Sequence, residues 1–93
     1  MTENPAGHTH IRRKKLQFRS WHRGTRELDL IFGSFADAAI ETLDEGELDD
    51  YERLLNLPDT DLMDWMLTGK PVPADIDSAL MQRILAFRHN MPF

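Results

Sequence analysis

Apolar positions recur along the chain mainly at the spacing of an α-helix. One stripe repeats every three to four residues and predicts a single buried helical face: Leu28, Ile31, Phe32, Phe35, Ala39 and Leu43. Thr25 stands just before this stripe and is expected to cap the helix, with Glu27 in its first turn. Gly33 interrupts the stripe, so we expect a neighbouring helix to pack closely against it.

Four other segments carry helical spacing and are separated by turn residues. The predicted helices run from about Thr9 to Trp21, from Glu47 to Asn56, from Asp59 (as the cap) to Gly69, and from Asp75 to His89. Gly24 follows the first of these and is expected to reverse the chain with a left-handed backbone. No segment shows the alternation typical of a strand. The predicted fold class is all-α, a compact five-helix bundle.

The helices are expected to form a single domain over residues 9–90. Residues 1–8 contain Pro5 and Gly7 without periodic apolar positions, which predicts a flexible N-terminal tail. Residues 91–93 follow the last predicted helix as a short C-terminal tail. A chain of 93 residues has room for one core and little room for a deep, closed active site.

Composition adds a charge asymmetry to this fold. Residues 1–27 hold seven basic and two acidic side chains, whereas residues 28–93 hold four basic and fourteen acidic ones. The first segment therefore carries +5 and the remainder −10, which gives the formal net charge of −5. A basic front on an acidic body steers encounters with charged surfaces.

The residue patterns of catalytic and metal sites are missing from the sequence. The three serines, Ser20, Ser34 and Ser78, lie outside any nucleophile elbow, and no phosphate loop or dinucleotide fingerprint occurs. There is no cysteine to act as a nucleophile or a metal ligand. The histidines lack the partner spacing of helical metal sites: His8, His10, His22 and His89. We therefore expect no enzyme activity, no metal site and no stably bound cofactor.

The turn Arg23-Gly24-Thr25-Arg26-Glu27 is the strongest candidate for a functional site. It places two guanidinium groups and one carboxylate at a helix–helix junction, and Gly24 has no side chain to block a partner. The alternative is structural, an ion pair between Arg23 and Glu27 worth about 0.5 kcal/mol on a surface. These residues alone do not decide between the two interpretations.

Two features beside this turn also have two interpretations each. Trp21 ends a thinly apolar helix, where it either packs under the turn or stays partly exposed for a partner. The basic run of residues 12–15 (RRKK) resembles a nucleic-acid patch, which gives a small nucleic-acid-binding or general adaptor protein as the alternative function. The other interpretation of this run is a solvated helix face that pairs with the acidic body.

The string Trp21-His22-Arg23-Gly24-Thr25-Arg26-Glu27-Leu28-Asp29 resembles the RGxxE signature of the FAD assembly factors of succinate dehydrogenase. These are the bacterial SdhE proteins and the mitochondrial succinate dehydrogenase assembly factor 2. The likeness continues through residues 58–65 (PDTDLMDW) and residues 69–71 (GKP), and covers roughly residues 11–90. It implies a five-helix protein that binds the flavoprotein subunit of succinate dehydrogenase, and in some bacteria that of fumarate reductase, and promotes covalent attachment of FAD to a histidine of that subunit.

The resemblance also implies roles for the residues of the turn. Gly24 would permit close docking, Arg23 would pair with acceptors on the partner, and Glu27 would orient Arg23 or reach donors on the partner. Trp21 and Arg26 complete the expected partner-binding set. The implied protein is a chaperone that holds no FAD of its own and acts on the FAD of its partner. It would work in the cytoplasm of a bacterium or in the mitochondrial matrix of a eukaryote, without inserting into a membrane.

Overall fold

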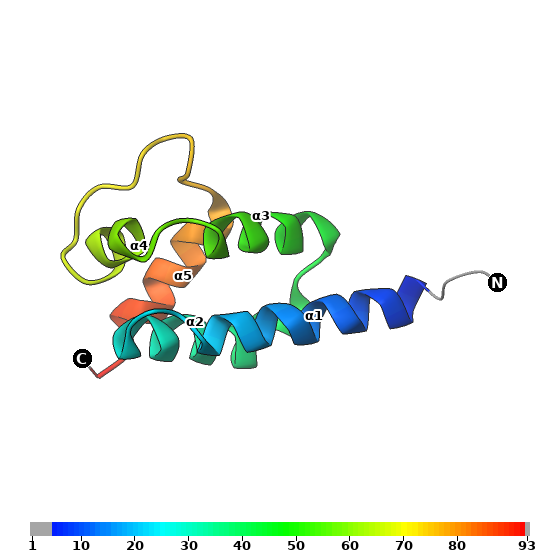
Figure 1. The fold of residues 1–93 in the computed structure, drawn as a ribbon. Coiled ribbons are helices and arrows are strands. Elements are labelled where there is room, and N and C mark those ends of the chain that lie inside the picture. Colours follow the sequence, from blue (N-terminus) through cyan, green and yellow to red (C-terminus); the bar gives the residue numbers. More distant parts are fainter. Residues whose placement is uncertain (1–4, 93) are drawn as a thin grey trace.

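Helices make up most of the computed structural model, which describes the backbone of residues 5–92 and the side chains of residues 8–92 (Figure 1). The elements in chain order are α1 (Pro5–Trp21), α2 (Arg26–Ala39), the short 3-10 helix η1 (Ile40–Thr42), α3 (Glu45–Leu55), α4 (Asp59–Met66) and α5 (Ala79–His89). No strand occurs in these residues, and the helices pack into one globule. The predicted all-α class with five helices is confirmed.

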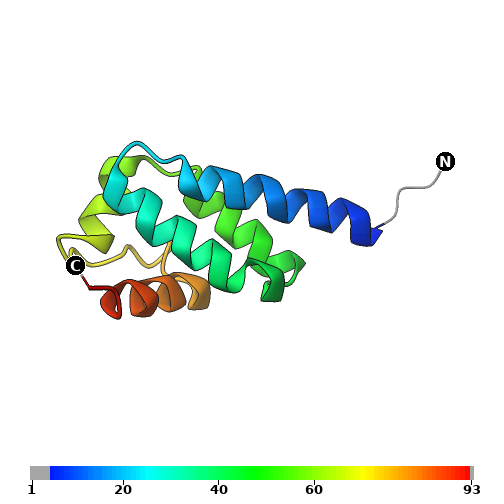
Figure 2. The same ribbon diagram turned by 90° about the horizontal axis from the view of Figure 1, so that it is seen from below.

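The central element of the fold is α2. It runs back along α1 as the second arm of a helical hairpin, and α5 lies on its opposite side (Figure 2). The helix α3 packs on α1 and α5, while α4 packs on α2 near the α1–α2 turn (Figure 1). The first turns of α1 extend beyond the other helices in both views, so one helix reaches out from an otherwise rounded body.

The core is built around the apolar face of α2. All six residues of the predicted stripe are buried, with Leu28, Ile31 and Phe32 fully inaccessible to solvent. The other helices add one or more buried side chains each, among them Leu16, Leu48, Tyr51, Leu54, Leu62, Met66, Leu80, Met81 and Ile84. The periodic pattern therefore predicted the buried face of α2 correctly, because that pattern follows from packing one side of a helix.

The helices α1 and α2 pack closely at Gly33. A Cβ atom at this position would overlap the indole ring of Trp21, so only glycine leaves room for the ring. The indole Nε1 of Trp21 also donates a hydrogen bond to Asp37 Oδ1 at 3.2 Å. The expected close packing at Gly33 is confirmed, and its partner is the tryptophan at the end of α1.

Two helices begin earlier than predicted. The first starts at Pro5 in place of Thr9, because proline has no N–H to lose in the first turn of a helix. Four residues of the predicted tail 1–8 are therefore helical, and residues 1–4 lie outside the described part of the chain. The third starts at Glu45 in place of Glu47, because Asp44 caps it and forms a reciprocal capping box with Glu47.

The last helix begins later than predicted. It starts at Ala79 in place of Asp75, because Ser78 acts as its N-cap and accepts a hydrogen bond from Met81 N at 3.1 Å. The helix ends at His89, as predicted. Of the predicted C-terminal tail, residues 91 and 92 are described and residue 93 lies outside the described range.

One buried polar cluster ties α1, α2 and α3 together. Ser20 Oγ lies 2.6 Å from Tyr51 OH and 2.7 Å from Leu16 O, and Tyr51 OH lies 3.2 Å from Phe32 O. Ser20 and Tyr51 are both fully buried. Because a buried hydroxyl costs free energy unless it is hydrogen-bonded, this cluster fixes how the three helices meet.

Tyr51 should make the protein sensitive to alkali. Burial raises the pKa of its phenol above the ordinary value of 10.0. As the pH rises, Tyr51 of the unfolded chain therefore loses its proton at a lower pH than Tyr51 of the folded protein. The stabilisation from neutral Tyr51 is complete below pH ~10 and is lost as the pH rises further.

We expect the denaturation midpoint of the wild-type protein to fall more steeply above pH ~10 than that of Tyr51→Phe. Because Tyr51 is the single tyrosine, tyrosinate absorbance follows it directly. Ionisation at pH ~10 without unfolding would contradict this expectation.

Candidate functional site

Four of the five predicted site residues lie at one corner of the fold, and Trp21 directly precedes it at the end of α1. Residues 23–27, here called the corner, join α1 to α2 and lie against the turn between α3 and α4. Thr25 is the N-cap of α2, and its Oγ1 accepts a hydrogen bond from Leu28 N at 3.2 Å, as predicted. The backbone N–H of Arg23 donates to Asp29 Oδ1 at 2.5 Å, so α2 holds the corner from its own first turn.

The guanidinium group of Arg23 is directed into the protein. Its side chain is 10% exposed, and its Nη1 donates to Leu55 O at 2.6 Å. Its Nη2 donates to Leu57 O at 3.3 Å and to Asp59 Oδ1 at 2.7 Å. Carbonyl groups at the end of α3 lack helical partners and attract a cation. Arg23 therefore connects the corner to the α3–α4 turn, and the ion pair with Glu27 that was the alternative interpretation does not occur in the described structure.

Asp59 binds both Arg23 and Gly24 of the corner. Its Oδ1 accepts from Arg23, while its Oδ2 accepts from the backbone N–H of Gly24 at 2.7 Å. The prediction that Asp59 caps α4 is wrong: Pro58 is the N-cap residue, and Asp59 is the first residue of the helix. The reason is that its carboxylate is engaged by donors about 35 residues earlier in the chain.

Gly24 is required for a different reason from the one predicted. Its backbone is not left-handed, since Gly69 is the one residue with positive φ among those that the structure describes. A Cβ atom at Gly24 would instead overlap Asp59 Oδ2. The glycine therefore lets its own N–H approach the carboxylate that also binds Arg23.

Arg26 and Glu27 form the outward face of the corner. Both side chains are exposed, and neither makes a hydrogen bond or ion pair within the described chain. Trp21 is half-buried, and its ring lies on Gly33 of α2 and not under the corner. The structure thus brings the five predicted residues to one region but separates them into buried and exposed groups.

Two functional candidates were not assigned to the corner from the sequence. Asp29 and Asp59 each accept a hydrogen bond from a backbone N–H of the corner. The signal for Asp29 was its place directly after the motif, within the string that ends in Leu28-Asp29. Asp59 also lies within the resemblance, in residues 58–65, but nothing there linked it to the corner, because its partners are distant in sequence and its position at a helix start suggested a cap.

The arginines of α1 are all held by the rest of the protein, Arg12 by carboxylates and the other two by uncharged acceptors. Arg12 makes ion pairs with Glu45 at 3.2 Å, Asp49 at 2.6 Å and Glu52 at 3.1 Å. The hydrogen bond to Asp49 is the main cause that raises the pKa of Arg12 above its ordinary value. Arg13 donates to the carbonyl oxygens of Ile40 and Leu43, and Arg19 donates to Asn56. These contacts support the structural interpretation of the basic run.

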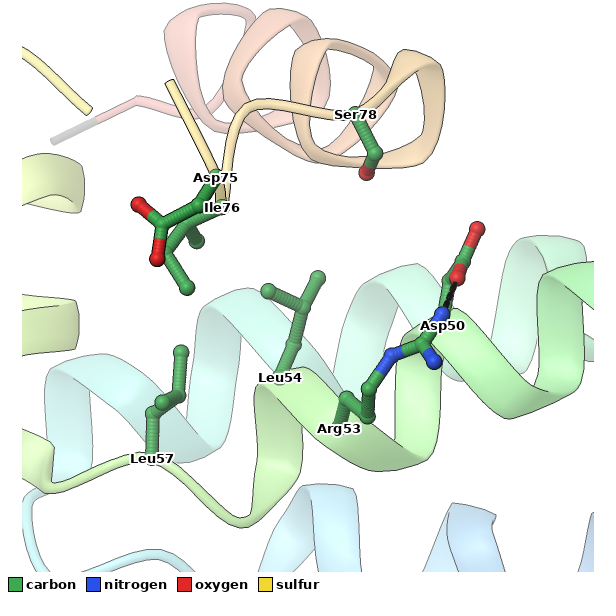
Figure 3. A pocket seen from close by; sticks show the side chains of 7 residues that line it. All are labelled: Asp50, Arg53, Leu54, Leu57, Asp75, Ile76 and Ser78. Atoms are coloured by element: carbon green, nitrogen blue, oxygen red, sulfur yellow. Dashed lines mark hydrogen bonds and ion pairs between the residues drawn. The ribbon is translucent and has the colours of Figure 1, made fainter. Parts of the chain in front are cut away.

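A hollow of about 290 Å³ lies between α3 and the segment that leads into α5 (Figure 3). Leu54, Leu57 and Ile76 form its apolar part, and the ion-paired Asp50 and Arg53 lie at one end of it. None of its lining residues belongs to the corner.

Among the described side chains no group of three or more potential ligands is placed to hold a metal ion. No helix of the described part is long and apolar enough to cross a membrane.

The described residues thus form a small all-helical domain whose polar corner is held by hydrogen bonds to the α3–α4 turn. The chain belongs to the family described as flavinator of succinate dehydrogenase, which it matches over residues 14–88. That range contains the whole corner and both aspartates that hold it.

Individual relatives support the same family. The FAD assembly factor SdhE of Acetobacter pasteurianus is 38% identical over 74 residues, which cover 80% of this chain and 68% of that protein. The mitochondrial succinate dehydrogenase assembly factor 2 of Dictyostelium discoideum is 39% identical over 80 residues, covering 86% of this chain and 57% of its own length. Its counterpart in Danio rerio is 32% identical over 82 residues, covering 52% of its own length. The chain thus spans little more than half of these mitochondrial relatives.

Proposed function

We propose that this protein promotes covalent attachment of FAD to the flavoprotein subunit of succinate dehydrogenase. The observation that carries the proposal is the family match over residues 14–88, which includes the complete corner. The name of the Acetobacter relative, a FAD assembly factor, and the names of the mitochondrial relatives support the same assignment. The flavoprotein of fumarate reductase is a second partner of the same kind.

The proposed mechanism is positioning, with the bond-forming chemistry left to the flavoprotein. A rigid surface that binds one conformation of a partner raises the population of that conformation. If histidine and flavin meet in the bound conformation, the reaction gains from orientation alone. The protein itself then acts as a chaperone without a catalytic group and without a stable FAD site of its own.

The corner supplies this rigid surface in the proposed mechanism. Arg23, Gly24 and Asp59 hold the corner against the α3–α4 turn through contacts inside the protein. Arg26 and Glu27 face outward, so their charges are available to a partner. We therefore assign Arg23 and Gly24 to building the docking surface, and Glu27 and Arg26 to touching the flavoprotein. Trp21 supports the surface from its place on Gly33.

The nucleic-acid alternative has no comparable support. It needs the basic run of α1 to present its charge to phosphates. Arg12 and Arg13 of that run are instead engaged by the body of the protein, and only Lys14 and Lys15 of the run lack an ion pair or hydrogen-bond partner within the described residues. We propose that the protein works where its flavoprotein is assembled, in the bacterial cytoplasm or the mitochondrial matrix.

Replacing Glu27 by alanine tests the outward face of the corner. We expect the affinity for the purified flavoprotein subunit to fall by about tenfold or more, because a charge at the centre of an interface is lost. The fold should lose at most about 0.5 kcal/mol of stability, since Glu27 makes no hydrogen bond or ion pair within the described chain and acts only through its place in the first turn of α2. Titration calorimetry measures the affinity, and Glu41→Ala is the matched control, an exposed glutamate on η1 without a side-chain partner in the described part of the chain.

The two possible failures of this experiment have different meanings. If Glu27→Ala binds as tightly as the wild-type protein, the docking role of Glu27 is wrong. If the wild-type protein itself does not bind the flavoprotein subunit, the proposed function is wrong.

A further inference from the structure

The outer face of α1 is apolar and basic, whereas a solvent-facing helix side is usually polar. Ile11 and Phe18 are 55% and 64% exposed, and they are the large hydrophobic side chains that stand exposed within the described residues. Residues 11, 15, 18 and 22 are four, three and four positions apart, so they lie along one side of the helix. Leu16 and Ser20 are buried on the opposite side. We call Ile11, Lys14, Lys15, Phe18 and His22 the outer stripe.

The aromatic end of the outer stripe is ordered without help from the core. The rings of Phe18 and His22 stack with their centroids 3.9 Å apart and an interplanar angle of 18°. His22 Nδ1 also lies 2.6 Å from Phe18 O, which holds the imidazole over the helix. An exposed aromatic pair that is already fixed loses little conformational freedom when a partner covers it.

The charges of the outer stripe differ from those on the inner edges of α1. Arg12, Arg13 and Arg19 all have acceptors in the body of the protein. Lys14 and Lys15 are exposed and make no ion pair within the described chain. Carboxylates of the body therefore pair with Arg12, and uncharged acceptors hold Arg13 and Arg19. The two lysines remain as exposed cations beside the exposed apolar side chains. A complementary partner surface is apolar in its centre and carries carboxylates at its rim.

The outer stripe is continuous with the corner. His22 directly precedes Arg23, and the stripe leads from there along α1 to the turns that extend beyond the body (Figure 1). The exposed residues 26 and 27 and the outer stripe are thus joined through three residues of the chain. One helix face that inserts between the walls of a partner's groove is a common binding mode, read as anchors three, four and seven positions apart.

We infer that the outer stripe of α1 is a second docking surface for the same flavoprotein subunit, and that it seats in an apolar groove flanked by carboxylates. This inference rests on the proposed function, because it takes its partner from there. Ile11 and Phe18 supply the apolar anchors, and Lys14 and Lys15 bind the carboxylates at the rim.

The test measures the affinity of the full chain for the purified flavoprotein subunit. Replacing Ile11 and Phe18 together by alanine should weaken binding at least about tenfold, while Phe18→Leu keeps an apolar anchor and most of the affinity. Replacing Lys14 and Lys15 together by glutamate should weaken binding by a similar factor and reduce its salt dependence. Lys70→Glu, beyond α4, is the control for a lysine charge reversal; it breaks an exposed ion pair with Asp64 and should still leave the affinity within about twofold. Circular dichroism and melting temperature should match the wild type for all these variants, since the altered side chains lie outside the core.

Three results would overturn the inference. Wild-type affinity in both stripe variants, with affinity still lost in Glu27→Ala, would remove the second surface and leave the proposed function in place. A dimer of the wild-type chain that the stripe variants dissociate, without any change in flavoprotein affinity, would assign the stripe to a second copy of this chain. No binding by the wild-type chain would overturn the proposed function and this inference together.

Discussion

Replacing Asp59 by alanine is expected to destabilise the protein by about 2–3 kcal/mol. The substitution leaves the buried guanidinium of Arg23 without its carboxylate and the N–H of Gly24 without its acceptor. Removal of one partner from a fully buried ion pair costs about 3–5 kcal/mol, and the 30% exposure of the Asp59 side chain lowers this expectation. Since small domains have a total stability of about 5–15 kcal/mol, the loss is a large share. Urea denaturation followed by circular dichroism measures it.

Asp61→Ala is the matched control for this prediction. Asp61 lies in the same first turn of α4, is exposed and has no side-chain partner within the described chain. Its replacement should cost no more than about 0.5 kcal/mol, the contribution of an acidic side chain near a helix N-terminus. Equal losses for Asp59→Ala and Asp61→Ala would mean that Asp59 acts only through the helix dipole and does not hold the corner.

Replacing Gly24 by alanine is expected to remove most of the affinity for the flavoprotein subunit, by a factor of about ten to one hundred. The added methyl group overlaps Asp59 Oδ2, so either the carboxylate leaves Arg23 or the corner moves away from the α3–α4 turn. Either movement displaces Arg26 and Glu27 from their outward positions. Gly24→Arg should abolish binding altogether. Titration calorimetry with the purified flavoprotein measures both variants.

Gly46→Ala separates a general glycine effect from an effect on the corner. A Cβ atom at Gly46 would lie 3.5 Å from Asp44 Oδ1, an ordinary contact, and Gly46 stands in the first turn of α3. This variant should fold at least as stably as the wild type and bind normally, because alanine favours a helix over glycine. Unchanged flavoprotein affinity in Gly24→Ala would contradict the docking role of the corner.

Features that depend on neighbouring residues were predictable from the sequence. The buried face of α2 and its Thr25 cap follow from spacing and from contacts three residues apart. The packing at Gly33 was expected because a glycine within a helix needs a compensating contact. The separation of the corner into a buried Arg23 and an exposed Arg26 and Glu27 was not predictable. Arg23 binds carbonyl groups that come near it only in the folded chain.

Competing uses of one side chain caused the clearest error. Asp59 follows a proline at the start of a helix, which is a strong capping signal, yet its carboxylate is used by Arg23 and Gly24. The same limit applies to the basic run of α1. Its composition did not reveal that the two arginines face the body of the protein while the two lysines face solvent. The acceptors of Arg12 and Arg13 lie on η1, on α3 and on the turn between them, all distant in sequence.

Covalent flavin on the flavoprotein subunit is the most direct measure of the central claim. In-gel flavin fluorescence after denaturation reports only FAD that is covalently attached. We expect a strong flavoprotein band in cells that contain this protein, little or none in cells that lack it, restoration by the wild-type chain, and no restoration by Gly24→Arg. A flavoprotein band of full intensity in cells without the protein would contradict the account.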